Sequence, residues 1–249
     1  MRQRSMAMPL PCANWSFVPL AAGPGIAYVA MARAGSGSLR AVLANLYGMD
    51  RPAFPHDHSC TLRGLASRHP DARRVIVPLR PLHDRIVSGF TRSQRRQCRP
   101  PAYKPACVPP LREAPERFVK HIARFAPGSV LPTFMKPANA YVNLNLSSKN
   151  RRIDVRFVCT CQLRTHVARA LEVWNVPGAD AAWEGVENRH VTVNATLPPL
   201  SDEAIAYLRR RFPMDYALVE RNGCGERDCA DTPKEGAALA RLNSRSGSA

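Results

Sequence analysis

The chain has 249 residues, and its 36 lysine and arginine residues outweigh 19 aspartate and glutamate residues to give a formal net charge of +17 at pH 7. This length can bury a full core and favours one domain over two. No apolar run reaches roughly 18 residues, so the sequence argues against a membrane span. Nearly all of the positive charge is arginine, whose planar fork matches phosphate, sulfate and carboxylate groups. An anionic cofactor, an anionic acceptor and nucleic acid are therefore all admissible partners.

The cysteine spacing bears on metal binding and on the compartment. The eight cysteines include no C-x-x-C pair, so the sequence argues against a zinc site. Free thiols and a few disulfides of a secretory compartment are both compatible with the spacing. Residues 1–22 begin with basic residues, but prolines interrupt their apolar part, and we interpret them as a loose leader.

The first predicted element is a buried strand. Seven apolar residues, 26–32, follow the breakers Gly23-Pro24-Gly25 and end at Arg33. After a turn rich in glycine and serine, apolar residues recur at the spacing of an amphipathic helix. These residues are Leu39, Val42, Leu43 and Leu46.

The turn between this strand and this helix is typical of an anion-binding loop. Successive backbone amides and the positive end of the helix dipole point at one place, and glycine lets the backbone approach a phosphate-like group closely. The Walker pattern is missing, because Gly35 and Gly37 are too close together and no lysine follows them. A nucleoside triphosphatase is therefore disfavoured.

A second strand-to-helix junction follows a polar loop. Gly48 is predicted to end the first helix, and residues 50–63 form the loop, which contains His56-Asp57-His58. A strand is predicted over 74–79, with Pro78 near its end or on an unpaired side because proline has no N–H. The strand ends at a basic residue and a proline that can begin a helix, Arg80-Pro81. The apolar face of this helix holds Leu82, Ile86, Val87 and Phe90.

The rest of the chain adds one strand and three helices to the prediction. Residues 92–112 are rich in arginine and proline and are predicted to be a surface insertion without regular structure. A helix is predicted from Pro115 to Pro127, and a strand over 153–159 leads into another helix. Ser201 is predicted to cap the last helix. The inward residues of these last two helices are Leu163, Val167, Leu171, Trp174, Ile205, Leu208 and Phe212.

Strands that alternate with helices across long crossovers predict an α/β fold with a parallel sheet covered by helices on both faces. The predicted domain spans residues 23–223. Residues 224–249 lack apolar periodicity and are interpreted as a disordered tail.

Both strand-to-helix junctions resemble motifs of one enzyme family. The turn from Arg33 to Ser38 resembles the 5′-phosphosulfate loop of sulfotransferases that use 3′-phosphoadenosine 5′-phosphosulfate (PAPS), with Arg33 where that family has a lysine. The segment from Arg80 to Phe90 resembles the 3′-phosphate motif of the same family, with Arg80, Arg85 and Ser88 at the family's spacing and the proline one place early. Two phosphate motifs in this order are harder to obtain by accident than either one alone.

Weaker similarities point to the carbohydrate-acting, Golgi-type branch of the family. One of them, the strand and helix start around 153–163, departs from the family because Gln162 replaces an acid. The others are Lys136-Pro137, Val193-Asn194 and Asp215-Tyr216.

The resemblance implies a three-layer P-loop-type fold and transfer of a sulfuryl group from PAPS to a hydroxyl of a carbohydrate acceptor, which could itself be anionic. Such transfer depends on positioning and on neutralising charge, so no metal is implied. Arg33 is assigned to the bridging and leaving oxygens, and Arg80 with Ser88 to the 3′-phosphate. The implied PAPS-binding residues are Arg33, Ala34, Gly35, Ser36, Gly37, Ser38, Leu39, Arg80 and Ser88.

The acceptor hydroxyl also needs a base. His56 or His58 is the best placed, because the loop after the first helix should overhang the carboxyl edge of the sheet. The compartment stays open: the chain reads as soluble, with the Golgi lumen as the alternative if a membrane anchor lies outside this sequence.

Two other functions remain as alternatives. A basic protein that binds an anionic glycan or nucleic acid without turnover is favoured by the arginine-rich stretch at 92–112, by Arg33 in place of a lysine and by Gln162 in place of an acid. Tyr103 is the only aromatic residue near that stretch, so nucleic acid is not the expected partner. A small-molecule kinase of the P-loop type is disfavoured by the missing Walker lysine.

Overall fold

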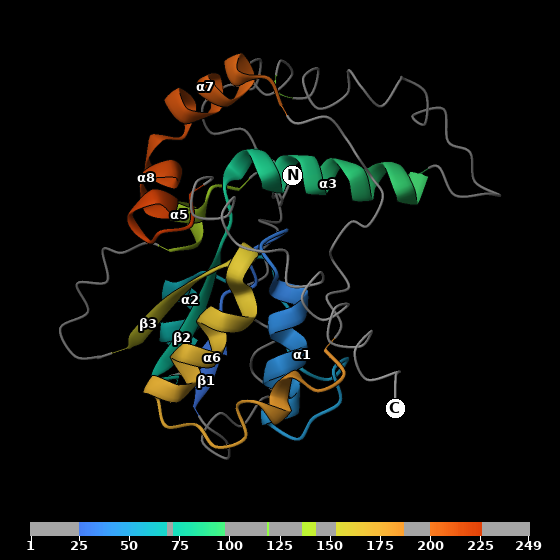
Figure 1. The fold of residues 1–249 in the computed structure, drawn as a ribbon, viewed down its shortest axis with the longest axis vertical. Coiled ribbons are helices and arrows are strands. Elements are labelled where there is room, and N and C mark those ends of the chain that lie inside the picture. Colours follow the sequence, from blue (N-terminus) through green and yellow to red (C-terminus); the bar gives the residue numbers. More distant parts are fainter. Residues whose placement is uncertain are drawn as a thin grey trace, which may run out of the picture.

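The computed structural model describes residues 25–68, 72–97, 119, 136–142, 153–186 and 200–225, with the backbone alone for 90–97. These residues form a mixed α/β fold around one small parallel sheet (Figure 1). The sheet has the strand order β1 (Ile26–Tyr28), β2 (Arg74–Leu79) and β3 (Asp154–Cys159). Because the strands are parallel, their carboxyl ends meet at one edge of the sheet.

The register of the central strand explains how the sheet accepts a proline. β1 pairs with β2 up to Tyr28 opposite Ile76, whereas β2 pairs with β3 up to Leu79 opposite Cys159. Ile76 turns its backbone toward β1, since its carbonyl accepts from Val29, and Pro78, two residues later, turns the same way. Pro78 thus lies past the last β1 pair, and its expected place on an unpaired side is confirmed.

Helices pack on this sheet through apolar faces, two of which the sequence pattern predicted. Figure 1 shows α1 (Ser36–Leu46) and α6 (Leu163–Val173) in front of the sheet and α2 (Leu62–Arg68) behind it. Their inward side chains join those of the strands in the main core. Its members include Tyr28, Leu39, Leu43, Leu65, Ile76, Val167 and Leu171, all buried.

A second group of helices lies above the carboxyl edge of the sheet. In Figure 1, α3 (Leu82–Gln97) crosses this edge, and α5 (Ala138–Tyr141), α7 (Asp202–Arg211) and α8 (Pro213–Arg221) gather beside its first turns. They enclose a smaller core of their own. Its buried members are Leu82, Ile86, Val119, Leu200, Leu208 and Tyr216.

Local signals for helix ends hold where the structure describes them. The Ser201 hydroxyl accepts from the amide of Ala204 at 3.3 Å, which confirms the predicted N-cap of α7. Gly48 has φ 60 just after α1, which confirms the predicted stop. Short 3-10 turns, η5 (Thr160–Gln162) and η6 (Ala181–Trp183), precede α6 and follow it.

The sequence prediction missed two helices and placed one boundary too early. α2 was missed, because its short apolar pattern lies within a polar loop. α8 was missed as well, because Pro213 follows α7 directly, although proline is well tolerated at the start of a helix. α3 continues through residue 97 into the expected irregular insertion, since arginine is a good helix former. The remainder of that insertion lies outside the described residues, as do the leader and most of the helix predicted after Pro115.

A disulfide closes the fold at the end of α8. Cys159, the last residue of β3, is bonded to Cys224, and both are buried. Cys224 is therefore part of the core rather than the first residue of a tail. The bond spans 65 residues, a separation for which loop-closure entropy predicts about 4 kcal/mol of stabilisation. Cys60 and Cys161 are disulfide-bonded too, so each of the four cysteines in the described ranges is in a disulfide.

No helix within the described ranges is both long and apolar enough to cross a membrane.

Candidate anion-binding site

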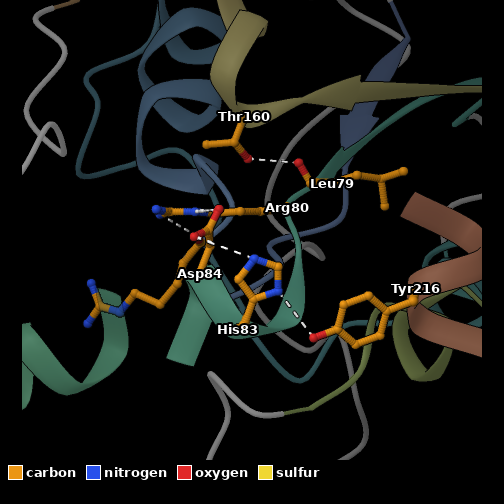
Figure 2. Close-up of polar contacts among 7 residues, drawn as sticks. Leu79, Arg80, His83, Asp84, Thr160 and Tyr216 are labelled. Atoms are coloured by element: carbon orange, nitrogen blue, oxygen red, sulfur yellow. Dashed lines mark hydrogen bonds and ion pairs between the residues drawn. The ribbon is translucent and has the colours of Figure 1, made fainter. Parts of the chain in front are cut away.

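The three strands deliver their following segments to one place at the carboxyl edge of the sheet. The segment after β1 forms the loop 29–35, the segment after β2 begins with Arg80, and the segment after β3 is η5. A hydrogen bond of 2.9 Å from the Thr160 hydroxyl to the Leu79 carbonyl ties the ends of β2 and β3 together (Figure 2). β1 pairs with β2 on the other side, so the two motifs that suggested a phosphate site follow neighbouring strands, as the predicted parallel sheet implies.

The first of these segments has a strained backbone. Arg33 has φ 64 and Gly35 has φ 75, both in the left-handed region, which only glycine enters without strain. A Cβ on Gly35 would lie 3.0 Å from Leu163 Cδ2 and 3.5 Å from Thr160 Cγ2. Glycine is therefore required at position 35 both for its conformation and for the close packing against the start of α6. A non-glycine residue held in a strained conformation is common at functional sites.

Three successive amides at the start of α1 are open. The helix begins at Ser36, earlier than predicted, so the amides of Ser38 and Leu39 already donate to the Gly35 carbonyl at 3.0 and 3.1 Å. These two amides, which were predicted to bind a phosphate, therefore already have an acceptor within the helix. Ala34 likewise donates to Met31. Within the described ranges the amides of residues 35–37 have no acceptor, which leaves them available to an anion.

Two serine hydroxyls lie at the same helix start. Ser36 and Ser38 are 5% and 6% exposed, and neither side chain makes a hydrogen bond to the part of the chain that the structure describes. Neither serine acts as the cap of α1, whose N-cap is Gly35. Their hydroxyls are thus polar groups close to the open amides, in keeping with the predicted role of both serines.

Arg80 connects the second junction to the first. Its Nη1 donates to the Arg33 carbonyl at 3.3 Å. Its Nε lies 3.8 Å from Asp84 Oδ2, and Figure 2 shows these two side chains facing each other. Burial lowers the pKa of the Arg80 guanidinium, and the negative charge of Asp84 opposes that shift. The group stays cationic near neutral pH because an arginine pKa starts so high. The sequence did not indicate that Asp84 would compete with an anion for Arg80.

Figure 2 shows that Asp84 also faces His83. His83 Nε2 lies 3.9 Å from Asp84 Oδ1, and its Nδ1 is 3.1 Å from the hydroxyl of Tyr216, whose ring stacks on the imidazole. Tyr216 belongs to α8, so this contact fastens the upper helices to the site. Tyr216, one of the two residues of the weak C-terminal similarity, is thus connected to the candidate site through His83.

Arg85 is not a ligand residue. It is fully buried, its Nη2 lies 3.1 Å from Asp215 Oδ1, and its Nη1 donates to the Lys136 carbonyl at 2.8 Å. Asp215 also accepts from the amide of Ala138. Spacing alone placed Arg85 in a phosphate motif, but the packing of α3 against α5 and α8 uses it inside the protein. Within the described ranges Arg85 Nε and Asp215 Oδ2 have no hydrogen-bond partner.

Ser88 lies two turns into α3 and is half-buried. Among the described contacts none joins its side chain to Arg80 or to the loop, so the structure does not bring the two predicted 3′-phosphate ligands into contact. The side chain of Phe90, the last residue of that motif, lies outside the described part, and so does Val193-Asn194.

The two histidines of the first polar loop lie over the end of β1. Arg40 of α1 holds this loop by donating to the carbonyls of Phe54 and Pro52, both at 2.6 Å. His58 Nδ1 is 2.6 Å from the Ala30 carbonyl, and His56 Nδ1 is 2.6 Å from the Tyr28 hydroxyl. The two rings meet edge to face at 4.5 Å. The expectation that this loop overhangs the carboxyl edge is confirmed.

His58 has the better geometry for a base. A carbonyl only accepts, so Nδ1 carries the proton in the bond to Ala30, and the neutral ring keeps its lone pair on Nε2. No described residue donates to that nitrogen. His56, by contrast, is engaged with a buried tyrosine, Tyr28, whose pKa burial raises. The sequence could not separate the two histidines, because the difference lies in which backbone and side-chain groups each one meets.

Lys136 is a further cation beside the loop 29–35. The sequence analysis did not assign this residue to the site. Its Nζ lies 4.4 Å from the centroid of the Tyr141 ring, and the Tyr141 hydroxyl is hydrogen-bonded to the backbone of Ala32. Burial lowers the pKa of the Lys136 ammonium, and Asp57 opposes that shift. The only sequence signal was the weak similarity of Lys136-Pro137 to a family segment.

No group of three or more histidine, cysteine, aspartate or glutamate residues within the described part of the chain could hold a metal ion. Comparison with protein-family models, with curated proteins and with solved structures gives no match for this chain.

Proposed function

We propose that the protein is a PAPS-dependent sulfotransferase of a three-layer P-loop type, which moves a sulfuryl group to a hydroxyl of a carbohydrate acceptor. The observation that carries the proposal is the set of three open amides, 35–37, at the start of a helix, in a loop that contains Arg33 and is bonded to Arg80. Backbone amides at a helix start and arginine side chains are the donors that phosphate and sulfate groups prefer.

Each part of the site has a role in this proposal. The open amides and the hydroxyls of Ser36 and Ser38 bind the 5′-phosphosulfate, and Arg33 neutralises charge on the bridging and leaving oxygens. Arg80 binds the 3′-phosphate, for which it exchanges its contact with Asp84. Ser88 is a second ligand of the 3′-phosphate only if that phosphate reaches along α3.

The transfer itself is an in-line substitution at sulfur. The acceptor oxygen forms a bond to the sulfur, and the bond from the sulfur to the bridging oxygen breaks. The electron pair leaves with that oxygen, which becomes part of the 5′-phosphate of 3′-phosphoadenosine 5′-phosphate (PAP). His58 Nε2 takes the proton of the acceptor hydroxyl, for which the hydrogen bond of its Nδ1 to Ala30 prepares it.

Titration calorimetry with PAP and AMP tests the proposal. The two nucleotides differ by the 3′-phosphate, and one charge-assisted contact is worth about 1.5 to 3 kcal/mol, so we expect PAP to bind at least about tenfold more tightly. Arg80→Ala should remove most of this preference and leave the thermal melt of the ligand-free protein nearly unchanged. Equal affinities for PAP and AMP in the parent protein would rule out the sulfotransferase assignment.

The second candidate function is a binding protein for an anionic glycan that keeps this fold without turnover. One observation favours it: Arg80 is already held between the Arg33 carbonyl and Asp84. A radiolabelled-sulfate transfer assay on a panel of glycan acceptors distinguishes the two functions. Binding of PAP together with no transfer to any acceptor would make the binding protein the better account.

The disulfides bear on the compartment in which this function operates. Disulfides form and persist in secretory and extracellular compartments and are rare in the cytosol. The buried bond between Cys159 and Cys224 at the end of β3 therefore favours a secretory compartment. Gel mobility of the protein extracted under thiol-blocking conditions tests this: reduced cysteines in the native protein would contradict it.

A further inference from the structure

The ammonium of Lys136 has no anionic partner at hydrogen-bond distance in the part of the chain that the structure describes. Its near neighbour of opposite charge, Asp57, favours the charged ammonium without a described ion pair, and Asp57 Oδ1 accepts from the amide and the hydroxyl of Ser59 at 2.8 and 2.6 Å. The remaining described contact of Lys136 is the face of the Tyr141 ring. A half-buried cation in this position is desolvated without a full ion pair, and a bound anion would compensate it.

The backbone around Lys136 is held by the buried ion pair that the site does not otherwise use. Arg85 binds the carbonyl before Pro137, and Asp215 accepts from the amide after it. A fully buried ion pair is expensive to form and often contributes little to stability compared with apolar residues. Here each partner of the ion pair binds the backbone on one side of Pro137. The backbone from which the Lys136 side chain extends is therefore held in place.

Lys136 lies on the same side of the loop 29–35 as His56 and His58. Tyr141, under the ammonium, bonds to Ala32, and Asp57 lies between the two histidines, of which His58 bonds to Ala30. Arg80 reaches the loop from the other direction, at Arg33. The loop is therefore flanked by Arg80 on the side of α3 and by Lys136 on the side where the acceptor hydroxyl and its base must meet.

We propose that Lys136 binds the sulfuryl group of PAPS during transfer, as the compact ammonium that the loop lacks because Arg33 stands where a lysine is usual. The proposal rests on the sulfotransferase function argued above. An ammonium is a point charge on a flexible stem and can follow oxygens as their charge grows, whereas the planar guanidinium of Arg33 is suited to the phosphate oxygens. Lys136 makes no covalent bond and takes no proton in this role.

The test compares two nucleotides that differ at the group Lys136 is proposed to bind. PAPS carries the sulfuryl group and PAP does not, so their affinity ratio, measured by calorimetry without acceptor, isolates contacts to that group. In Lys136→Met we expect PAPS to bind about tenfold more weakly or worse, the usual cost of a lost charge-assisted contact, and PAP to bind within about twofold of the parent. Lys136→Arg should recover part of the loss.

Two controls separate a specific contact from a general effect. Arg210→Met removes one positive charge from an exposed position of α7 and should change neither affinity. Thermal melts of the ligand-free variants show whether each is folded; if Lys136→Met is not, Lys136→Gln is measured in its place.

The outcomes distinguish this proposal from the proposed function. Equal losses of PAP and PAPS affinity in the Lys136 variant, or no loss of either, would overturn the role of Lys136 while the sulfotransferase assignment stands. A parent protein that binds neither nucleotide would overturn both. A selective loss of PAPS binding, with a matching fall in kcat in the transfer assay, supports the proposal.

Discussion

The two strand-to-helix junctions at the carboxyl edge of the sheet offer an anion quite different donors. The first, from β1 to α1, offers backbone: a strained residue at position 33, a left-handed glycine at position 35 and three open amides. The second, from β2 to α3, offers side chains that are already engaged, Arg80 with Asp84 and Arg85 with Asp215. Both kinds of donor can be taken up by distant partners, as the Ala138 amide is by Asp215. In this protein the amides of residues 35–37 stay open whereas both arginines are engaged, so the first junction is the stronger evidence of an anion site.

The largest effect we expect is on the buried ion pair of the second junction. Asp215→Ala leaves the Arg85 guanidinium without its buried partner and should cost about 3 to 5 kcal/mol of unfolding free energy, measured by denaturant titration. The double variant Arg85→Met with Asp215→Leu should cost less, because both charges are removed together. If Asp215→Ala costs under about 1 kcal/mol, Arg85 is not held as described and its assignment to the phosphate motif returns.

The second expected effect concerns the side chain of the first junction. Arg33→Ala should lower sulfuryl transfer by about 10² or more, as loss of a positioned donor at the reacting group usually does. Arg33→Lys should keep or raise the activity, because it restores the residue usual in the resembling family. The measurement is the radiolabelled-sulfate assay with all three proteins. An Arg33→Ala variant as fast as the parent would show that the backbone of this loop is what matters.

The third prediction tests that backbone directly. Gly35→Ala should destabilise the fold by about 1 to 2 kcal/mol, through strain at a positive φ and contact with Leu163, and should weaken PAP binding as the amides shift. Gly48→Ala is the matched control, since its φ is also positive but a Cβ there meets nothing within 4 Å. Similar losses of PAP affinity in both variants would mean that the shape of the loop is not what binds the nucleotide.

The smallest effect should come from the competing carboxylate of the second junction. Asp84→Asn frees Arg80 from a partly exposed ion pair worth under about 1 kcal/mol, so PAP affinity should rise by about threefold with little change in the melting temperature. Glu220→Gln provides the control. It removes the same charge from an exposed ion pair between Glu220 near the end of α8 and Arg209 of α7. A fall in PAP affinity in Asp84→Asn would indicate that Asp84 orients Arg80 rather than competing for it.

The sequence by itself determined the local elements of this protein. Apolar periodicity located α1 and α6, the strand over 74–79 was predicted with its observed bounds, and Ser201 and Gly48 marked helix ends through groups that act within a few residues. It also placed the two junctions together, since parallel strands bring their carboxyl ends to one edge. These properties follow from near neighbours in the chain or from the simple geometry of a sheet.

Only the tertiary structure decided what each polar side chain is used for. Arg80 and Arg85 lie five residues apart in one motif, yet one reaches the candidate site and the other is buried against a partner 130 residues away. Lys136 comes to the loop through the Tyr141 ring of α5. His58 donates to the Ala30 carbonyl, whereas His56 is engaged with the Tyr28 hydroxyl. The reason is physical: spacing in sequence fixes which side chains share a face, but the partner that neutralises a charge is chosen by packing between distant segments.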